Sequence, residues 1–122
     1  MDAKRILVVD DNSAGRELIR SALEPRYQVE EAIDGCEGLR QIQDHRPDLV
    51  LMDIQMPCMD GYEVLKEIRK NESTATLPVI AVTAFAMFED RQKALGAGFD
   101  GYLPKPINVT VLRMQVELLF GQ

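Results

Sequence analysis

Short apolar runs alternate with amphipathic stretches along the whole chain. Residues 6–9, 49–52 and 77–82 are continuously apolar, which predicts strands buried on both faces. Residues 27–32 alternate apolar and polar positions, which predicts a weaker strand nearer an edge, and residues 101–103 predict a short further strand. Polar residues follow these runs directly, so chemically active side chains are expected where the strands end.

The segments between the strands carry apolar residues at helical spacing. They predict helices over residues 13–23, 35–44, 61–70, 88–95 and 108–120. Strand and helix therefore alternate five times, which predicts an α/β fold: a doubly wound parallel sheet of five strands with helices on both faces. Gly15 is an unfavourable residue within the first helix, where it costs about 1 kcal/mol relative to alanine.

Size and composition limit the classes of function. The 122 residues suit one domain spanning residues 1–122, and 46% hydrophobic with 28% charged residues is ordinary for a globular protein. The formal net charge of −6 argues against nucleic acid or an anionic membrane as the main partner. No apolar run approaches the length that spans a bilayer, and the N-terminus does not resemble a secretory signal. Cys36 and Cys58 fit neither a C-x-x-C pair nor a disulfide framework, which predicts two free thiols in the reducing cytoplasm.

Five polar residues follow strands that should all point the same way. Asp10 and Asp11 follow the first strand, Asp53 ends the third, Thr83 ends the fourth and Lys105 follows the fifth. Each has a simpler interpretation, as turn acids, a strand-end hydroxyl or a solvated charge. Because parallel strands end at one edge of a sheet, where ligands bind in open α/β folds, a shared site explains all five together.

The residue types indicate metal-assisted phosphoryl chemistry. Two carboxylates about 4 Å apart repel each other by ~1–4 kcal/mol, depending on the local dielectric, and a divalent cation relieves this. A set of oxygen ligands without histidine or thiolate suits Mg²⁺, with Mn²⁺ as the alternative ion. A carboxylate can act as the nucleophile and form an aspartyl phosphate, while the metal, the Lys105 ammonium and the Thr83 hydroxyl stabilise the transferring group.

Over nearly all of its length the chain resembles the receiver domains of bacterial two-component response regulators. The motifs that carry the resemblance are Val8-Val9-Asp10-Asp11-Asn12, Met52-Asp53-Ile54-Gln55-Met56-Pro57 with Asp60-Gly61, Val82-Thr83-Ala84, and Lys105-Pro106. The resemblance implies a flavodoxin-like sheet of order 2-1-3-4-5. It also implies phosphorelay signalling, in which a histidine kinase or a histidine phosphotransfer protein phosphorylates this domain, without turnover of a substrate.

The same resemblance implies a role for each residue of the site. Asp53 would be the phosphoacceptor. Asp11 and Asp53 would bind the metal directly, Asp10 through water and Gln55 through its backbone carbonyl. The phosphoryl oxygens would be held by Thr83, Lys105 and the backbone amide of Ala84.

Tyr102 stands at the position of the family's switch aromatic, and its alternative is an ordinary half-buried strand tyrosine. Phosphorylation would turn Thr83 and Tyr102 inward and change the surface of the fourth helix, fifth strand and fifth helix, where a downstream protein would bind. Phe85 offers an attacking water no hydrogen bond, which predicts a long-lived phosphoryl group. The apolar run of residues 85–88 is expected to pack in the core, with a docking patch as the alternative.

Two enzyme or carrier classes compete with this interpretation. Haloacid-dehalogenase-like phosphatases place a second carboxylate two residues after the nucleophile, where this chain has Gln55. Small flavin-binding carriers have a Gly/Ser/Thr-rich loop after the first strand, where this chain has acids. Residues 52–57 and 82–87 resemble those of stand-alone cell-cycle receivers and those of receivers fused to hybrid kinases. A stand-alone domain is the expectation, and a receiver cut from a hybrid kinase or multidomain regulator is the alternative.

Overall fold

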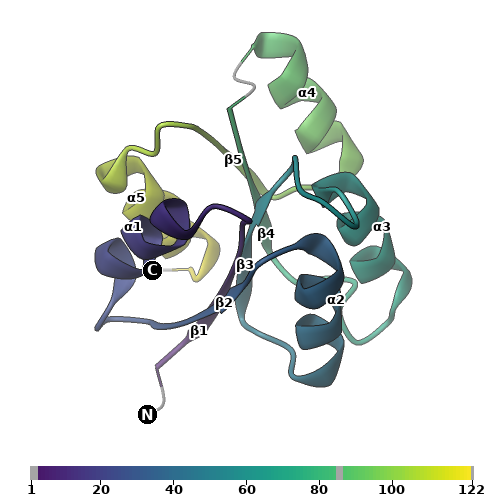
Figure 1. The fold of residues 1–122 in the computed structure, drawn as a ribbon, viewed down its shortest axis with the longest axis horizontal. Coiled ribbons are helices and arrows are strands. Elements are labelled where there is room, and N and C mark those ends of the chain that lie inside the picture. The colour runs from purple at the N-terminus through teal and green to yellow at the C-terminus, as the bar shows by residue number, and fades with distance from the viewer. Residues whose placement is uncertain (1–2, 85–86, 122) are drawn as a thin grey trace.

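The computed structural model describes residues 3–84 and 87–121. Its elements follow one another as strand and helix throughout (Figure 1). The strands are β1 (Arg5–Val9), β2 (Gln28–Ala32), β3 (Leu49–Asp53), β4 (Val79–Thr83) and β5 (Gly101–Pro104). The helices are α1 (Ser13–Leu23), α2 (Gly35–Asp44), α3 (Gly61–Lys70), α4 (Phe88–Ala97) and α5 (Val109–Leu119). The alternation predicted from the apolar pattern is confirmed.

All strand pairs are parallel, and the sheet order is β2-β1-β3-β4-β5. After β1, the chain places β2 at one edge of the sheet. It then returns to the other side of β1, where β3, β4 and β5 are added in turn toward the opposite edge. Such a reversal of direction opens a crevice at the carboxyl ends of the two strands that flank it, here β1 and β3. The fold class and the strand order expected from the sequence are both confirmed.

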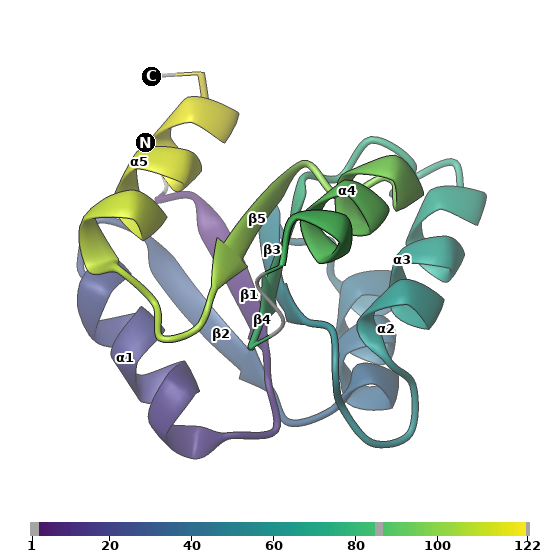
Figure 2. The same ribbon diagram turned by 90° about the horizontal axis from the view of Figure 1, so that it is seen from above.

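The sheet separates two hydrophobic cores, because successive side chains of a strand point to opposite faces. On β1, Ile6 and Val8 pack with residues of α1 and α5, whereas Leu7 and Val9 pack with residues of α2, α3 and α4. Figure 2 shows the resulting layers, with α1 and α5 on one side of the sheet and the other three helices opposite. Central strands covered on both faces explain why β3 and β4 are apolar almost throughout.

Capping residues mark where most helices begin and where α4 ends. Asn12, Asp34, Asp60 and Asn108 are N-caps whose side chains accept a backbone N–H of the first turn. Helix α4 continues two residues beyond the predicted end at Leu95, because the left-handed φ of 114° falls at Gly98 and not at Gly96.

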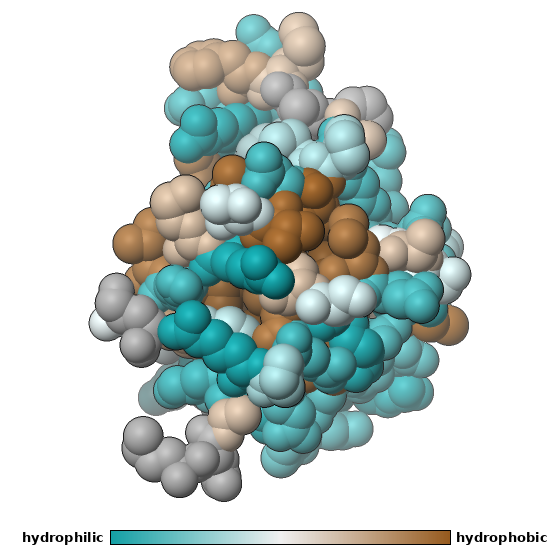
Figure 3. Space-filling model, turned by 90° about the vertical axis from the view of Figure 1, so that its left-hand side faces the viewer, coloured by the Kyte–Doolittle hydropathy of each residue, from teal (hydrophilic) through white to brown (hydrophobic). Residues whose placement is uncertain are grey.

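The outer surfaces of the helices are largely polar. Figure 3 views the side that carries α1 and α5 and shows hydrophilic surface around a hydrophobic area. The large exposed apolar side chains among the described residues of these two helices are Leu18, Met114 and Leu118. Within residues 3–84 and 87–121, no helix combines the length and apolar character needed to cross a membrane.

Candidate functional site

Three carboxylates meet at the carboxyl edge of the sheet. Asp10 follows β1, and Asp53 is the last residue of β3, the neighbouring strand. Both are almost fully buried, with exposed fractions of 2% and 6%, whereas Asp11 is exposed. Each of the three can offer an oxygen that lies within 4.8 Å of those of the other two. The three acids therefore lie together, as their positions in the sequence predicted, and their roles stay predictions.

Each buried carboxylate uses its two oxygens in the same way. Oδ1 of Asp10 accepts the backbone N–H of Asn12 at 2.9 Å, and Oδ1 of Asp53 accepts that of Gln55 at 3.1 Å. Oδ2 of each faces the Lys105 ammonium, at 3.2 Å from Asp10 and 2.9 Å from Asp53. The backbone therefore orients both side chains, and a single cation is shared between them.

Lys105 reaches the carboxylates because its backbone is tied to the neighbouring strand. Its N–H donates to the Thr83 carbonyl at 2.8 Å, just beyond the last paired residues of β4 and β5. The Lys105–Pro106 peptide bond is cis. The lysine thus enters the site from the fifth strand, as its position in the sequence predicted.

The charges and the burial of the site shift two ionisations. Burial raises the pKa of Asp53 above its usual value, and the charge of Asp10 adds to this, while the hydrogen bond from Lys105 opposes it. Burial alone would lower the pKa of Lys105, but its hydrogen bond to Asp53 and the charges of Asp53 and Asp10 outweigh burial and raise it. Three carboxylates and the Lys105 ammonium thus meet at this edge of the sheet.

Thr83 lies beside a cleft next to the carboxylates. It is 1% exposed at the end of β4. The cleft has a volume of about 350 Å³ and is lined by Ile54, Gln55, Asp60, Tyr62, Thr83, Asp90 and Lys93. Ala84, whose amide is the predicted phosphoryl ligand, is exposed directly after Thr83. The hydroxyl and the following amide thus lie at the edge of the sheet where the acids meet.

Tyr102 is half-buried on β5 and does not lie in the wall of that cleft. It lines a hollow formed by the start of α4, β5 and α5, with Met87, Phe88, Arg91, Pro104 and Gln115. Burial, followed by the charge of Asp90, raises the pKa of Tyr102. The structure thus places Tyr102 near α4, while the other predicted site residues gather around Asp53.

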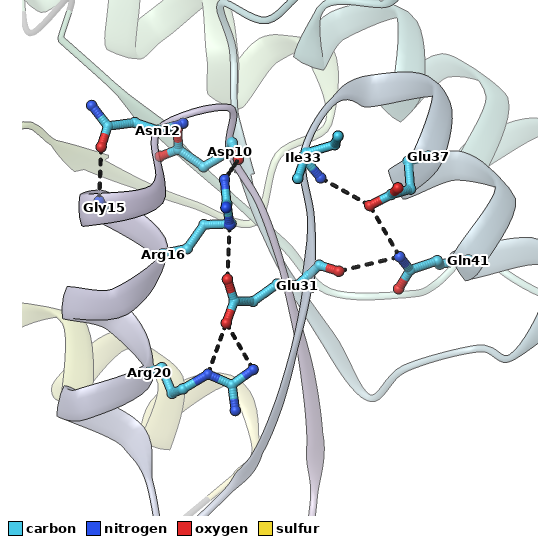
Figure 4. Close-up of polar contacts among 9 residues, drawn as sticks. All are labelled: Asp10, Asn12, Gly15, Arg16, Arg20, Glu31, Ile33, Glu37 and Gln41. Atoms are coloured by element: carbon cyan, nitrogen blue, oxygen red, sulfur yellow. Dashed lines mark hydrogen bonds and ion pairs between the residues drawn. The ribbon is translucent and has the colours of Figure 1, made fainter.

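An ion-pair network that could not be predicted from the sequence contacts the backbone of Asp10 (Figure 4). Arg16 donates to the backbone carbonyl of Asp10 at 2.8 Å and to Glu31 Oε1 at 2.8 Å, and Arg20 contacts Glu31 Oε2 at 2.8 Å. The hydrogen bond from Arg16, aided by Arg20, lowers the pKa of Glu31. Arg16 and Glu31 are 15 residues apart, so only the pairing of β1 with β2 could have indicated their contact.

The prediction of two free thiols was wrong, because Cys36 and Cys58 form a disulfide. Their Cα atoms are 5.9 Å apart, a separation typical of disulfides. Cys36 lies in the first turn of α2 and Cys58 in the loop between β3 and α3. Sequence spacing did not reveal the pair, because the two segments meet only when the sheet places α2 beside that loop.

The prediction that residues 85–88 pack in the core is wrong for the two residues that the structure describes. Met87 and Phe88 are 66% and 72% exposed at the start of α4. Phe85 and Ala86 lie outside the described residues, so the prediction about hydrolysis at Phe85 stays untested. An apolar run this short gave no indication of which face of the helix it occupies.

Comparison with known proteins identifies the family. The model of the response regulator receiver domain matches residues 6–117. The polar-differentiation response regulator DivK of Brucella anthropi is 40% identical over 107 residues, which cover 87% of each chain. The DNA-binding dual master transcriptional regulator RpaA of Synechocystis is 35% identical over 116 residues, covering 94% of this chain and 48% of RpaA. This chain therefore spans about half the length of RpaA.

Solved structures agree with this assignment. The receiver domain of the Francisella response regulator 1452 matches with a TM-score of 0.89 and 31% identity, covering 96% of each chain. The chemotaxis response regulator CheY4 of Vibrio cholerae also has a TM-score of 0.89, at 30% identity over 97% of this chain and 99% of CheY4.

The fold and the acidic site define a phosphorylation-switch signalling domain of the flavodoxin-like class. The chain belongs to the response regulator receiver domain family and acts in phosphorelay signalling. Receiver domains of this family interact with histidine kinases and with downstream targets.

Proposed function

We propose that Asp53 accepts a phosphoryl group from the phosphohistidine of a kinase or of a histidine phosphotransfer protein. The observation that carries this proposal is the shared Lys105 ammonium, 2.9 Å from Asp53 and 3.2 Å from Asp10 at the end of a buried strand. A cation held beside a buried carboxylate can neutralise the charge of an incoming phosphoryl group.

The transfer forms one bond and breaks one. An oxygen of the Asp53 carboxylate attacks phosphorus, the phosphorus–nitrogen bond of the phosphohistidine breaks, and its electron pair returns to the imidazole nitrogen. Lys105 then contacts a phosphoryl oxygen in place of a carboxylate oxygen. The Thr83 hydroxyl and the Ala84 amide, both at this edge of the sheet, hold the remaining oxygens.

The donor set fits a hard divalent cation. Asp10, Asp11 and Asp53 bring carboxylate oxygens within 4.8 Å of one another, and no histidine or cysteine of the described part of the chain joins this cluster. Asp11 and Asp53 would hold Mg²⁺, or Mn²⁺ in its place, directly. Asp10 would act through water and Gln55 through its backbone carbonyl. The ion supplies positive charge that offsets the negative charge of the site and of the phosphoryl group.

The output is a change of surface and not the turnover of a substrate. Phosphorylation draws Thr83 toward the phosphoryl group, and Tyr102 follows, which alters the face formed by α4, β5 and α5. A downstream protein binds this face, which carries exposed Met87 and Phe88. The net charge of −6 disfavours nucleic acid and anionic membranes as partners, and the proposed location is the cytoplasm.

Intact-mass measurement after incubation with acetyl phosphate tests the proposal. The wild-type protein should gain one phosphoryl group only when Mg²⁺ is present, and Asp53→Asn should gain none. Asp44→Asn is the matched control, because it makes the same change at an exposed residue at the end of α2, outside the acidic cluster. Phosphorylation of Asp53→Asn at the wild-type rate would exclude Asp53 as the acceptor. If the wild type gained no phosphoryl group and also failed to bind beryllofluoride, a working phosphoacceptor site would be excluded.

A further inference from the structure

The disulfide joins α2 to the loop that shapes the acidic site. Cys58 comes five residues after Asp53, and Cys36 is the second residue of α2. Gly35, next to Cys36, packs so closely against the Met59 carbonyl that a Cβ at position 35 would collide with that oxygen. The start of α2 and the β3–α3 loop are therefore in contact as well as bonded.

The loop itself is tightly closed. The Gly61 N–H donates to the Ile54 carbonyl at 2.8 Å, and the Met59 N–H donates to the Pro57 carbonyl at 2.9 Å. Cys58, between Pro57 and Met59, has a φ of 73°. A residue other than glycine rarely adopts this left-handed conformation unless its surroundings hold it there. Two restraints act directly at Cys58: the covalent link to α2 and the hydrogen bond between its two neighbours, Pro57 and Met59.

This same loop begins with groups that the acidic site uses. The Gln55 N–H orients Asp53 through Oδ1 at 3.1 Å, and Gln55 precedes Cys58 by only three residues. A constraint on Cys58 therefore limits the motion of the backbone that positions Asp53. The bond is also open to chemistry, because Cys58 is exposed and Cys36 is half-buried.

We propose that Cys36 and Cys58 form a reversible redox site, reduced by a dithiol protein reductant, whose state sets the affinity of the acidic site for Mg²⁺. The proposal rests on the proposed cytoplasmic function, because the disulfides found in that compartment are mostly transient or redox-sensing. It assigns a modification site and a class of partner beyond phosphorelay signalling.

Thiol–disulfide exchange accounts for both directions. A thiolate of the reductant attacks Sγ of Cys58, the more exposed of the two residues. The bond to Cys36 breaks, and Cys36 leaves as a thiolate that takes up a proton. The second thiol of the reductant then displaces Cys58 and leaves the reductant oxidised, so two electrons reach the protein. In oxidation, one Cys thiolate attacks oxidised glutathione and releases one glutathione thiol, and the other Cys then displaces the second glutathione and closes the disulfide.

Reduction should weaken Mg²⁺ binding. Without the bond, Cys58 can leave its left-handed conformation, and the loop that carries Gln55 samples more arrangements. Binding an ion must then order that loop, which lowers affinity compared with a preorganised site. We expect the dissociation constant for Mg²⁺ to rise roughly three- to tenfold on reduction. Phosphorylation by acetyl phosphate at subsaturating Mg²⁺ should slow to a similar extent.

The test compares wild-type protein treated with dithiothreitol or with oxidised glutathione, using calorimetric Mg²⁺ titration and thiol counting by maleimide labelling and mass. Cys36→Ser and Cys58→Ser are the matched variants, and both should bind Mg²⁺ like the reduced wild type under either condition. Circular dichroism checks that each remains folded. The proposal is supported if the two thiols appear and disappear reversibly within one chain and Mg²⁺ affinity follows them.

Three results would overturn it: thiols that stay reduced with oxidised glutathione, disulfides that link two chains, or equal Mg²⁺ affinity in both redox states. Failure of the proposed phosphoacceptor function looks different. In that case Mg²⁺ affinity would still follow the redox state, while neither form would take up a phosphoryl group from acetyl phosphate.

Discussion

The ammonium of Lys105 lies 2.9 Å from Oδ2 of Asp53, the carboxylate that ends the central strand β3. The same ammonium lies 3.2 Å from Asp10, so one cation serves two buried acids while Asp11 adds a third negative charge nearby. A metal ion held by these acids would therefore compete with Lys105 for their negative charge. This competition separates two functions, metal binding and stabilisation of the phosphoryl group, and they can be tested separately.

Replacing Lys105 by glutamine should separate these functions. Lys105→Gln removes a cation that competes for Asp53, so Mg²⁺ should bind at least as tightly as in the wild type. The phosphoryl group loses a charged partner, and the rate of phosphorylation by acetyl phosphate should fall by at least about tenfold. Calorimetry and intact mass against time measure the two effects. Lys66→Gln, on the exposed face of α3, is the control and should change neither. Parallel losses of binding and rate would argue that Lys105 only maintains the structure.

Asp53→Asn should stabilise the metal-free protein. The pKa of Asp53 is raised, so its contribution to stability is present below its usual pKa and is lost as pH rises through the folded value. At pH 7 the buried carboxylate is therefore a cost, and the neutral amide of the variant should raise the free energy of unfolding by about 1–2 kcal/mol. Urea unfolding measures this. Added Mg²⁺ should then stabilise the wild type but not the variant. If Asp53→Asn were less stable than the wild type without Mg²⁺, the ion pair between Asp53 and Lys105 would contribute more to stability than the burial of Asp53 costs.

The fold and most of the acidic cluster were predictable because they depend on local patterns. Apolar runs located the strands, and the parallel arrangement then placed Asp10, Asp53, Thr83 and Lys105 at one edge. The Cys36–Cys58 bond and the Arg16–Glu31 pair depend on segments that become neighbours only through the sheet order. The exposure of Phe88 was missed because apolar character alone does not tell which side of a helix faces the core.

The ion pairs beneath Asp10 should make stability depend on pH. The hydrogen bond from Arg16, with that from Arg20, lowers the pKa of Glu31, so its contribution is present above its usual pKa and is lost as pH falls through the folded value. Glu31→Gln should therefore cost about 0.5–1 kcal/mol at pH 7, and the difference from wild type should shrink near pH 3. Urea unfolding at both pH values tests this, with exposed Glu72→Gln as the control. A cost that stays the same at both pH values would point to packing and not to charge.

Two helical glycines offer a comparison of stability with function. A Cβ added at Gly96 in α4 would meet no atom within 4 Å, so Gly96→Ala should gain helix propensity alone, about 0.5–1 kcal/mol in urea unfolding. At Gly15 in α1, an added Cβ would lie 3.1 Å from Oδ2 of Asp10, the oxygen that faces Lys105. Gly15→Ala should therefore gain less stability than Gly96→Ala, because the carboxylate must move aside. Its Mg²⁺ affinity should fall by a factor of about three or more, since Asp10 would no longer be held in place. Equal stabilisation by the two substitutions, with unchanged Mg²⁺ binding in the calorimeter, would show that Asp10 adjusts without consequence and that Gly15 has no part in shaping the site.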